Sequence, residues 1–196
     1  MEVKEYLENV KKVFDEIDKT EVETMLHHIL EAYDNRKMIF VIGNGGSAAN
    51  ASHFAEDLSK GVITDQNVEK RIRAISLADN VPFITASAND SGYENIFVSQ
   101  LITFANPDDY LIAISGSGNS KNIIKAVEYS KIRRINVIGV TGYDGGKLKE
   151  LCDISVHVPL NEMCTVESIH SIIFHYITGH LREVLTGEKF NTPSFH

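Results

Sequence analysis

The chain has 196 residues, of which 43% are hydrophobic, and this fits one globular domain with a sizeable core. Its 19 Lys and Arg against 27 Asp and Glu give a formal net charge of −8, which argues against a broad face for nucleic acid or membranes. No apolar run approaches the roughly 20 residues that span a bilayer, and the charged N-terminus is unlike a secretory signal, so a cytoplasmic location is expected. Cys152 and Cys164 lack C-x-x-C spacing and are expected to be reduced thiols.

Two helices are predicted ahead of the first strand. Residues 2–18 place apolar side chains at helical spacing between charged ones, which is typical of an amphipathic helix. Thr20 followed by Glu23 has the pattern of a capping box and predicts the start of a second helix. We interpret residues 1–36 as a helical extension and 37–196 as the main domain, the two forming a single compact unit.

From residue 38 the pattern changes to short β-rich runs separated by segments of helical length. Strands are predicted at Met38–Ile42, Ile72–Ser76, Tyr110–Ile114, Asn136–Val140 and Ile154–Val158, and helices at 47–60, 80–105 in two pieces, 120–132, 146–151 and about 165–185. Strands that alternate with helices imply right-handed βαβ crossovers and a parallel sheet covered on both faces. The predicted fold class is α/β, a three-layer, doubly wound sheet of five parallel strands with the N-terminal helical extension.

Three unusual loops follow predicted strands, at the edge of the sheet where open parallel sheets bind ligands. The loop Gly43–Ser47 contains three glycines, which allow the backbone to approach an anion at the start of the next helix. The loop Ser115–Ser120 combines small residues with three hydroxyls and is the stronger candidate for a phosphate site. The third loop is Thr141–Gly146, after the fourth strand.

The first loop also satisfies the dinucleotide pattern G-x-G-x-x-A with Gly43, Gly45 and Ala48. That pattern expects an acidic residue about 20 positions on, at the end of the next strand. Here the next strand ends near Ser76 with Asp79 beyond it, so the spacing fails. A P-loop fails as well because the basic Walker lysine is missing.

A second group of side chains could bind a metal or transfer protons. His53 and Asp57 are four residues apart and share one helix face, and Glu167 and His175 on the terminal helix could join them. Their presence by chance on long helices is the alternative. Glu167 and His175 lie roughly 12 Å apart along an ideal helix, so they share one small ion only if Glu167 lies in an irregular first turn or the partners come from different subunits. His170 faces elsewhere and is interpreted as a packing residue or a group behind the ligands.

Taken together, these motifs resemble those of SIS sugar-phosphate-binding domains, and more closely those of the phosphoheptose isomerases. The resemblance spans Phe14 to Leu185. It rests on Gly43–Ala49 with His53, Asn89-Asp90-x-Gly92-Tyr93, Ser115–Ser120, Thr141–Gly146 and the His170/His175 pair. It implies a flavodoxin-like SIS fold and a homotetramer with active sites at subunit interfaces, acting on a small sugar phosphate and not on nucleic acid or membranes.

The resemblance also implies the site residues. Substrate would be bound by Asn44, Gly45, Gly46, Ser47, Asn89, Asp90, Ser115, Gly116, Ser117 and Ser120, with the three serines of the second loop on the phosphate. Family members commonly bind zinc through residues that correspond to His53, Asp57, Glu167 and His175. Asp57 stands where the family has Glu and Glu167 where it has Gln, which keeps two histidines and two oxygen ligands and makes the set more anionic. Gly116 stands where the family usually carries Thr.

The expected activity is aldose–ketose isomerisation of a phosphorylated sugar, above all sedoheptulose 7-phosphate to D-glycero-D-manno-heptose 7-phosphate through an enediolate, in lipopolysaccharide or capsule biosynthesis. Asp57 or Glu167 would be the base, His175 the acid or a metal ligand, and the ion the electrophile. Two alternatives stay open. One is an isomerase of another keto-sugar phosphate in glycan synthesis, and the other is a non-catalytic scaffold similar to the replication initiator-associating protein, a SIS relative.

Overall fold

The structure is a computed structural model that describes residues 2–189, and its centre is a five-stranded parallel sheet in the order β2-β1-β3-β4-β5. The strands are β1 (Met38–Ile42), β2 (Arg73–Ser76), β3 (Tyr110–Ser115), β4 (Asn136–Thr141) and β5 (Ile154–His157). In the register of the sheet, Ile39 of β1 lies between Ala74 of β2 and Tyr110 of β3. The predicted α/β class with five parallel strands is confirmed, and no strand end differs from its prediction by more than one residue.

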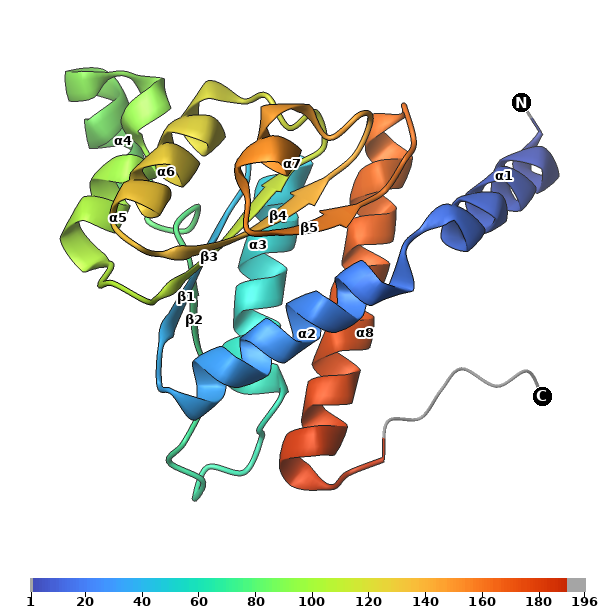
Figure 1. The fold of residues 1–196 in the computed structure, drawn as a ribbon, viewed down its shortest axis with the longest axis horizontal. Coiled ribbons are helices and arrows are strands. Elements are labelled where there is room, and N and C mark those ends of the chain that lie inside the picture. The colour runs from blue at the N-terminus through green and yellow to red at the C-terminus, as the bar shows by residue number, and fades with distance from the viewer. Residues whose placement is uncertain (1, 190–196) are drawn as a thin grey trace.

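Helices cover both faces of this sheet (Figure 1). They are α1 (Val3–Glu16), α2 (Lys19–Asp34), α3 (Gly46–Glu56), α4 (Val81–Ser91), α5 (Val98–Phe104), α6 (Lys121–Ile132), α7 (Gly146–Leu151) and α8 (Met163–Thr186), with a π-helical turn η1 (Asp57–Gly61) and a 3-10 turn η2 (Tyr93–Asn95). Side chains alternate along each strand, so Ile39 packs into the core under α2, α3 and α8, and Phe40 packs into the core under α5, α6 and α7.

Three helix boundaries differ from the sequence-based expectations, each for a local reason. The capping box at Thr20 is wrong: Asp18 caps α2 by accepting a 2.8 Å hydrogen bond from the Thr20 N–H, so the helix begins at Lys19. The helix expected over 47–60 is α-helical only to Glu56 and continues as the π-turn η1. The terminal helix begins at Met163, because the Glu162 carboxylate caps its first turn. The segment 80–105 forms the two predicted helices, α4 and α5, with the 3-10 turn η2 between them.

The two N-terminal helices differ in how they contact the rest of the molecule. Met25 and Ile29 of α2 are fully buried in the core. Helix α1 buries no side chain and projects from the molecule, and its Tyr6 hydroxyl lies 2.9 Å from Thr165 Oγ1 of α8 (Figure 1). No helix within residues 2–189 is long and apolar enough to cross a membrane.

Candidate active site

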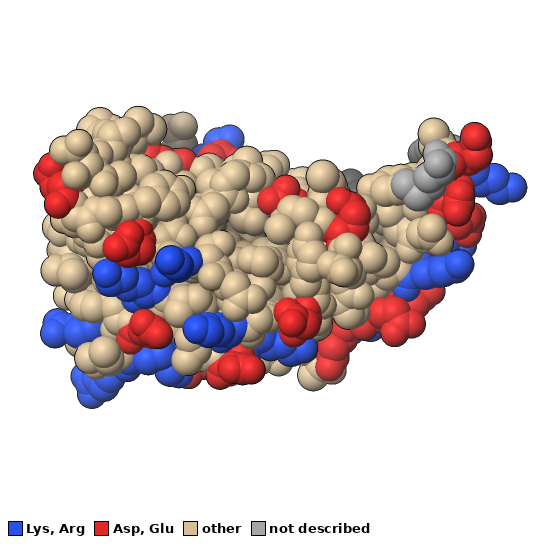
Figure 2. Space-filling view, turned by 90° about the horizontal axis from the view of Figure 1, so that it is seen from above, with Lys and Arg blue, Asp and Glu red and all other residues tan. Residues whose placement is uncertain are grey.

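The loops that follow β1 and β3 meet at the carboxyl edge of the sheet. The two strands are neighbours, but the helices after them, α3 and α6, lie on opposite faces, which makes this a topological switch point where open parallel sheets bind ligands. Figure 2 looks down on this side of the molecule. The two loops and the start of α8 enclose a pocket of about 210 Å³, lined by Asn44, Gly45, Gly46, Ser47, Ile114, Ser115, Gly116, Ser117, Ser120, Met163 and Glu167.

The loop Ser115–Ser120 presents hydrogen-bond donors to this pocket. Among the residues that the structure describes, no group accepts a hydrogen bond from the backbone N–H of Ser117 or Ser120. Helix α6 begins directly afterwards at Lys121, and the first N–H groups of a helix have no partner within the helix. Free N–H groups, serine hydroxyls and the positive end of the helix dipole together suit a phosphate.

The third loop, Thr141–Gly146, supports the phosphate loop from behind. Within the loop, Gly142 N donates a 2.9 Å hydrogen bond to Gly116 O. Directly after it, in α7, Leu148 N donates a 3.0 Å bond to Gly118 O and Lys147 N donates a 3.2 Å bond to Asn119 Oδ1. Gly118 has a φ of +64°, and a Cβ there would lie 1.9 Å from Gly145 O. Only glycine fits at position 118, because the backbone there has a positive φ and the third loop passes directly over it.

Asn44 is held by a side-chain network that sequence reasoning missed. Asn44 and Asn122 exchange two hydrogen bonds of 2.9 and 2.8 Å, and Asn122 Oδ1 also accepts from Ile123 N. The Tyr93 hydroxyl donates a 3.1 Å bond to Asn44 Oδ1. Asn122 lies in the first turn of α6, and its sequence position carries no signal beyond that.

Glu167 lies on the pocket side of α8, above the start of α3. Its Oε1 is 3.4 Å from the Ser47 hydroxyl that donates to it, and its backbone oxygen accepts a 2.9 Å bond from Asn50 Nδ2. A Cβ on Gly46 would lie 2.1 Å from Glu167 Oε2, so this carboxylate occupies the space over the glycine. Among the described residues that line the pocket, Glu167 is the one that is charged, and no Lys or Arg is among them.

Met163 fills the space that the absence of a side chain at Gly116 leaves. A Cβ on Gly116 would lie 2.6 Å from Met163 Sδ. The wall of the pocket at this point is therefore a thioether and not a hydroxyl. This residue, too, was not identified from the sequence.

Farther along α3 and α8, three of the four predicted metal ligands come together. Asp57 Oδ2 lies 3.7 Å from His53 Nε2 and 4.0 Å from His175 Nε2, and the ligand atoms of the three residues all lie within 4.8 Å of one another. We call these residues the His–Asp–His cluster. Glu167 does not belong to it, since it lies two helical turns before His175 on α8.

The aromatic rings beside the cluster fix the two helices against each other. Phe54 and Phe174 stack with their centroids 4.3 Å apart, and each neighbours one of the histidines in sequence. The imidazoles of His53 and His175 meet edge to face at 5.0 Å and are both about half exposed. The cluster is thus backed by stacked aromatic rings on the core side and open to solvent on the other.

Two further predicted groups lie outside the pocket. Asn89 and Asp90 are exposed on α4, where Asn89 Nδ2 donates a 2.8 Å bond to Asp90 Oδ1. Their segment reaches the site through Tyr93. His170 is completely buried, its Nε2 lies 3.1 Å from Thr141 O, and burial lowers its pKa to about 4. A neutral, buried imidazole under the third loop agrees with a packing role.

Known proteins similar to this chain share most of its length. A family model described as SIS domain matches residues 5–142. The phosphoheptose isomerase of Helicobacter pylori (strain P12) is 36% identical over 177 residues, which are 89% of this chain and 90% of that protein. The phosphoheptose isomerase of a Nitratiruptor species is 35% identical over 182 residues, 93% of this chain and 95% of that protein.

Solved structures give the same picture. The phosphoheptose isomerase of Francisella tularensis superposes with a TM-score of 0.85 at 28% identity, covering 92% of this chain and 96% of that one. The phosphoheptose isomerase of Neisseria gonorrhoeae gives a TM-score of 0.83 at 28% identity, covering 91% and 96%.

Proposed function

We propose that this chain, which belongs to the SIS-domain family of phosphoheptose isomerases and is a sugar-phosphate isomerase, converts sedoheptulose 7-phosphate to D-glycero-D-manno-heptose 7-phosphate. The observation that carries the proposal is the spacing of two groups along the neighbouring helices α3 and α8. The donors of Ser115–Ser120 lie near the start of both helices, and the His–Asp–His cluster lies at the end of α3 and halfway along α8.

This spacing suits an open chain of seven carbons. Met163, which packs over Gly116 of the phosphate loop, and His175 are twelve residues apart, or about 18 Å of helix. About eight bonds separate the phosphorus of a heptose 7-phosphate from C1, roughly 10 Å at about 1.2 Å per bond. Contacts of about 3 Å at each end bring the total to about 16 Å. A five-carbon chain is about two bonds shorter, so with its phosphate in the Ser115–Ser120 loop its C1 reaches the His–Asp–His cluster less well.

Isomerisation needs a base that moves a proton between C1 and C2, and we assign Asp57. The family carries Gln where this chain has Glu167, and an amide cannot take up a proton at neutral pH. The base therefore lies elsewhere, in the cluster. Asp57 Oδ2 faces the two imidazoles, and no described group donates a hydrogen bond to either oxygen of this carboxylate, so the carboxylate can accept the proton.

The His–Asp–His cluster fits a divalent cation, and we propose zinc. Zinc takes imidazole nitrogen and carboxylate oxygen at about 2.0–2.2 Å, which places neighbouring ligand atoms about 3.3–3.5 Å apart in a tetrahedron. The separations of 3.7 and 4.0 Å from Asp57 Oδ2 to the two imidazole nitrogens are close to that, and all three ligand atoms lie within 4.8 Å of one another. When bound, the ion would polarise the carbonyl and stabilise the charge of the enediolate.

Glu167 then serves the sugar chain. Its carboxylate lies between the phosphate loop and the cluster, at the level of Ser47 and Gly46. A carboxylate accepts hydrogen bonds from two neighbouring hydroxyls, so it would orient the middle of the polyol. This carboxylate, the shorter Asp57 and the Met163 wall also favour a second candidate, an isomerase of another keto-sugar phosphate.

We also propose that the working enzyme is a homo-oligomer, and specifically the tetramer that the family resemblance implies. Helices α1 and α8 expose large apolar side chains, among them Leu7, Ile172 and Tyr176. Light scattering of the purified protein tests this directly.

The reaction is tested by proton exchange. Zinc-loaded protein in D₂O should incorporate deuterium at the carbon alpha to the carbonyl of sedoheptulose 7-phosphate. Asp57→Asn should abolish this exchange, whereas Glu167→Gln should keep it with altered KM. A panel of five- to seven-carbon keto-sugar phosphates distinguishes the two substrates, and no exchange with any of them contradicts the proposal.

A further inference from the structure

The segment that follows Asp57 is a π-helical turn, and this turn is stabilised from outside. Val62 N donates a 2.9 Å hydrogen bond to Asp57 O, five residues back, where an α-helix would bond four back. Such turns are rare, and they occur frequently at functional sites. Here the first residue of the turn is Asp57, whose carboxylate belongs to the His–Asp–His cluster.

The last residue of the turn lies directly against that carboxylate. A Cβ added to Gly61 would lie 3.1 Å from Asp57 Oδ1, tighter than most side-chain contacts. The turn thus folds Gly61 back onto Asp57, and the missing side chain leaves Oδ1 room beside it. Any movement of Gly61 moves the surface against which the Asp57 carboxylate rests.

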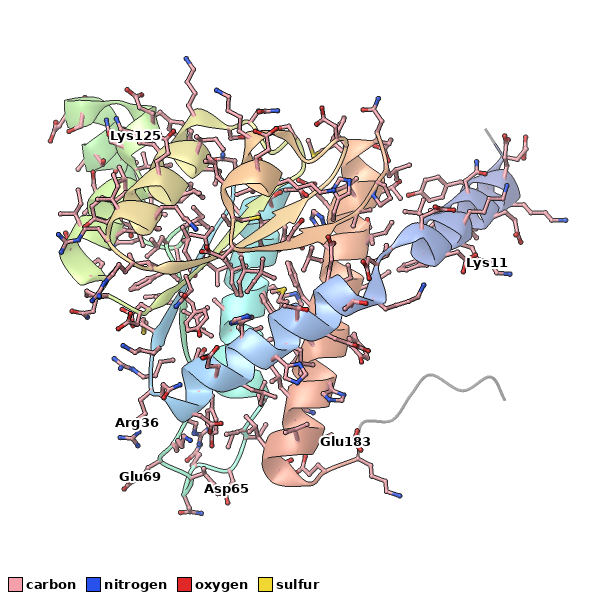
Figure 3. The ribbon with its side chains drawn as sticks, viewed as in Figure 1. Lys11, Arg36, Asp65, Glu69, Lys125 and Glu183 are labelled. Atoms are coloured by element: carbon pink, nitrogen blue, oxygen red, sulfur yellow. The ribbon has the colours of Figure 1, made fainter. Side chains whose placement is uncertain are left out.

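Arg182 holds Gly61 from α8. Its Nη2 donates a 2.6 Å hydrogen bond to Gly61 O, and its Nε is buried without a described partner. No ion pair joins Arg182 to a carboxylate within residues 2–189. Figure 3 shows that Glu183, the next residue, lies at the same end of the molecule as Asp65, a few residues after the turn.

We propose that Arg182 is a positioning residue, which holds the π-turn through the Gly61 carbonyl and so directs Asp57 at the two imidazoles. Partial burial of a guanidinium without a counter-charge is costly, so a structural gain must offset it. Arg182 lies two turns after His175 on α8. One helix therefore positions His175 directly and Asp57 indirectly, through the bond from Arg182 to Gly61. The inference rests on the proposed function, since it concerns the group assigned there as base and ligand.

The test compares three substitutions. Arg182→Met removes the donor, and Arg182→Lys keeps a charge and one donor. Arg71→Met is the matched control, because Arg71 also donates to backbone oxygens of this connection (Ile63, Asp65 and Val68) but not to Gly61. Each protein is titrated with Co²⁺ by its visible absorption, melted without metal, and assayed for kcat and KM.

Arg182→Met should weaken Co²⁺ binding at least tenfold and lower kcat at least tenfold, with KM within twofold of wild type. Arg182→Lys should recover most of both, and Arg71→Met should change only the melting temperature. Gly61→Ala gives an independent variant, and it should show the same losses because its Cβ displaces Asp57. Wild-type Co²⁺ affinity and kcat in folded Arg182→Met, or in Gly61→Ala if Arg182→Met does not fold, would overturn the inference and leave the proposed function intact. A wild type that neither binds Co²⁺ nor isomerises a sugar phosphate overturns the proposed function, and this inference with it.

Discussion

Asn44 and Asn122 exchange two side-chain hydrogen bonds, of 2.9 and 2.8 Å, across the switch point of the sheet. One residue belongs to the glycine loop after β1, and the other belongs to the first turn of α6 after the phosphate loop. Because Asn122 is only 2% exposed, water cannot replace these bonds readily. The pair therefore fixes the distance between the two loops that line the pocket.

Asn122→Ala should loosen the pocket and destabilise the fold. The substitution leaves the Asn44 amide with one described partner, Tyr93, and should lower the free energy of unfolding by about 1–3 kcal/mol. We expect a lower kcat/KM as well. Asn122→Asp can accept a hydrogen bond from Asn44 Nδ2 but cannot donate one to Asn44 Oδ1. Its stability and kcat/KM should therefore lie between those of the wild type and of Asn122→Ala. Urea unfolding and steady-state kinetics check this, and unchanged stability of Asn122→Ala would contradict it.

Ser117→Ala and Ser120→Ala should weaken phosphate binding. A hydrogen bond to a charged group is worth about 1.5–3 kcal/mol, so each change should raise KM about tenfold or more while kcat falls less. Competitive inhibition by inorganic phosphate should weaken in parallel. Ser168→Ala is the control, because this exposed serine bonds to Cys164 O within α8, and equal effects at all three serines would speak against the assignment.

Glu167→Gln should tighten anion binding. The carboxylate repels a phosphate in a pocket that no described Lys or Arg lines, so its removal should lower the inhibition constant of inorganic phosphate about two- to tenfold. The metal content should stay the same, because Glu167 lies outside the His–Asp–His cluster. Loss of bound zinc on this substitution, measured by elemental analysis, would make Glu167 a ligand after all.

Removal of divalent ions should stop turnover without disturbing phosphate binding. Dialysis against a chelator is expected to abolish isomerisation, and added Zn²⁺ should restore it. The proposed ion site and the phosphate loop share no residue and lie at different levels along α3 and α8. Inorganic phosphate binding, followed by calorimetry, should be unchanged within twofold. His175→Ala should prevent the recovery.

His170 should make the protein less stable in mild acid. Burial lowers its pKa from 6.5 to about 4, so between these values the unfolded state binds a proton that the folded state does not. Its contribution is present above pH 6.5 and is lost as the pH falls toward 4, about 2 kcal/mol between pH 7.5 and pH 5. His170→Gln should flatten this part of the pH profile of urea unfolding. His157, whose pKa burial also lowers, should leave a smaller residual slope.

Local pattern determined much of this protein. The β-rich runs and the helical spacing between them predicted a five-stranded parallel sheet, because burial on both faces requires apolar strands. The loops Gly43–Ser47 and Ser115–Ser120 could be placed at one edge, since parallel strands all end on the same side. Features set by a few adjacent residues were harder to locate, as the Asp18 cap and the π-turn after Glu56 illustrate.

Only the tertiary structure decided which distant segments of the chain contact one another. Met163 over Gly116, Asn122 on Asn44 and Arg182 on Gly61 join residues whose spacing in the chain carries no periodic signal. The separation of Glu167 from the His–Asp–His cluster, in contrast, follows from the spacing of Glu167 and His175 on one α-helix, Met163–Thr186. Periodicity reports which face of an element is buried, but the partner of each side chain follows from the order of strands and the packing of helices, and these minimise free energy over the whole chain.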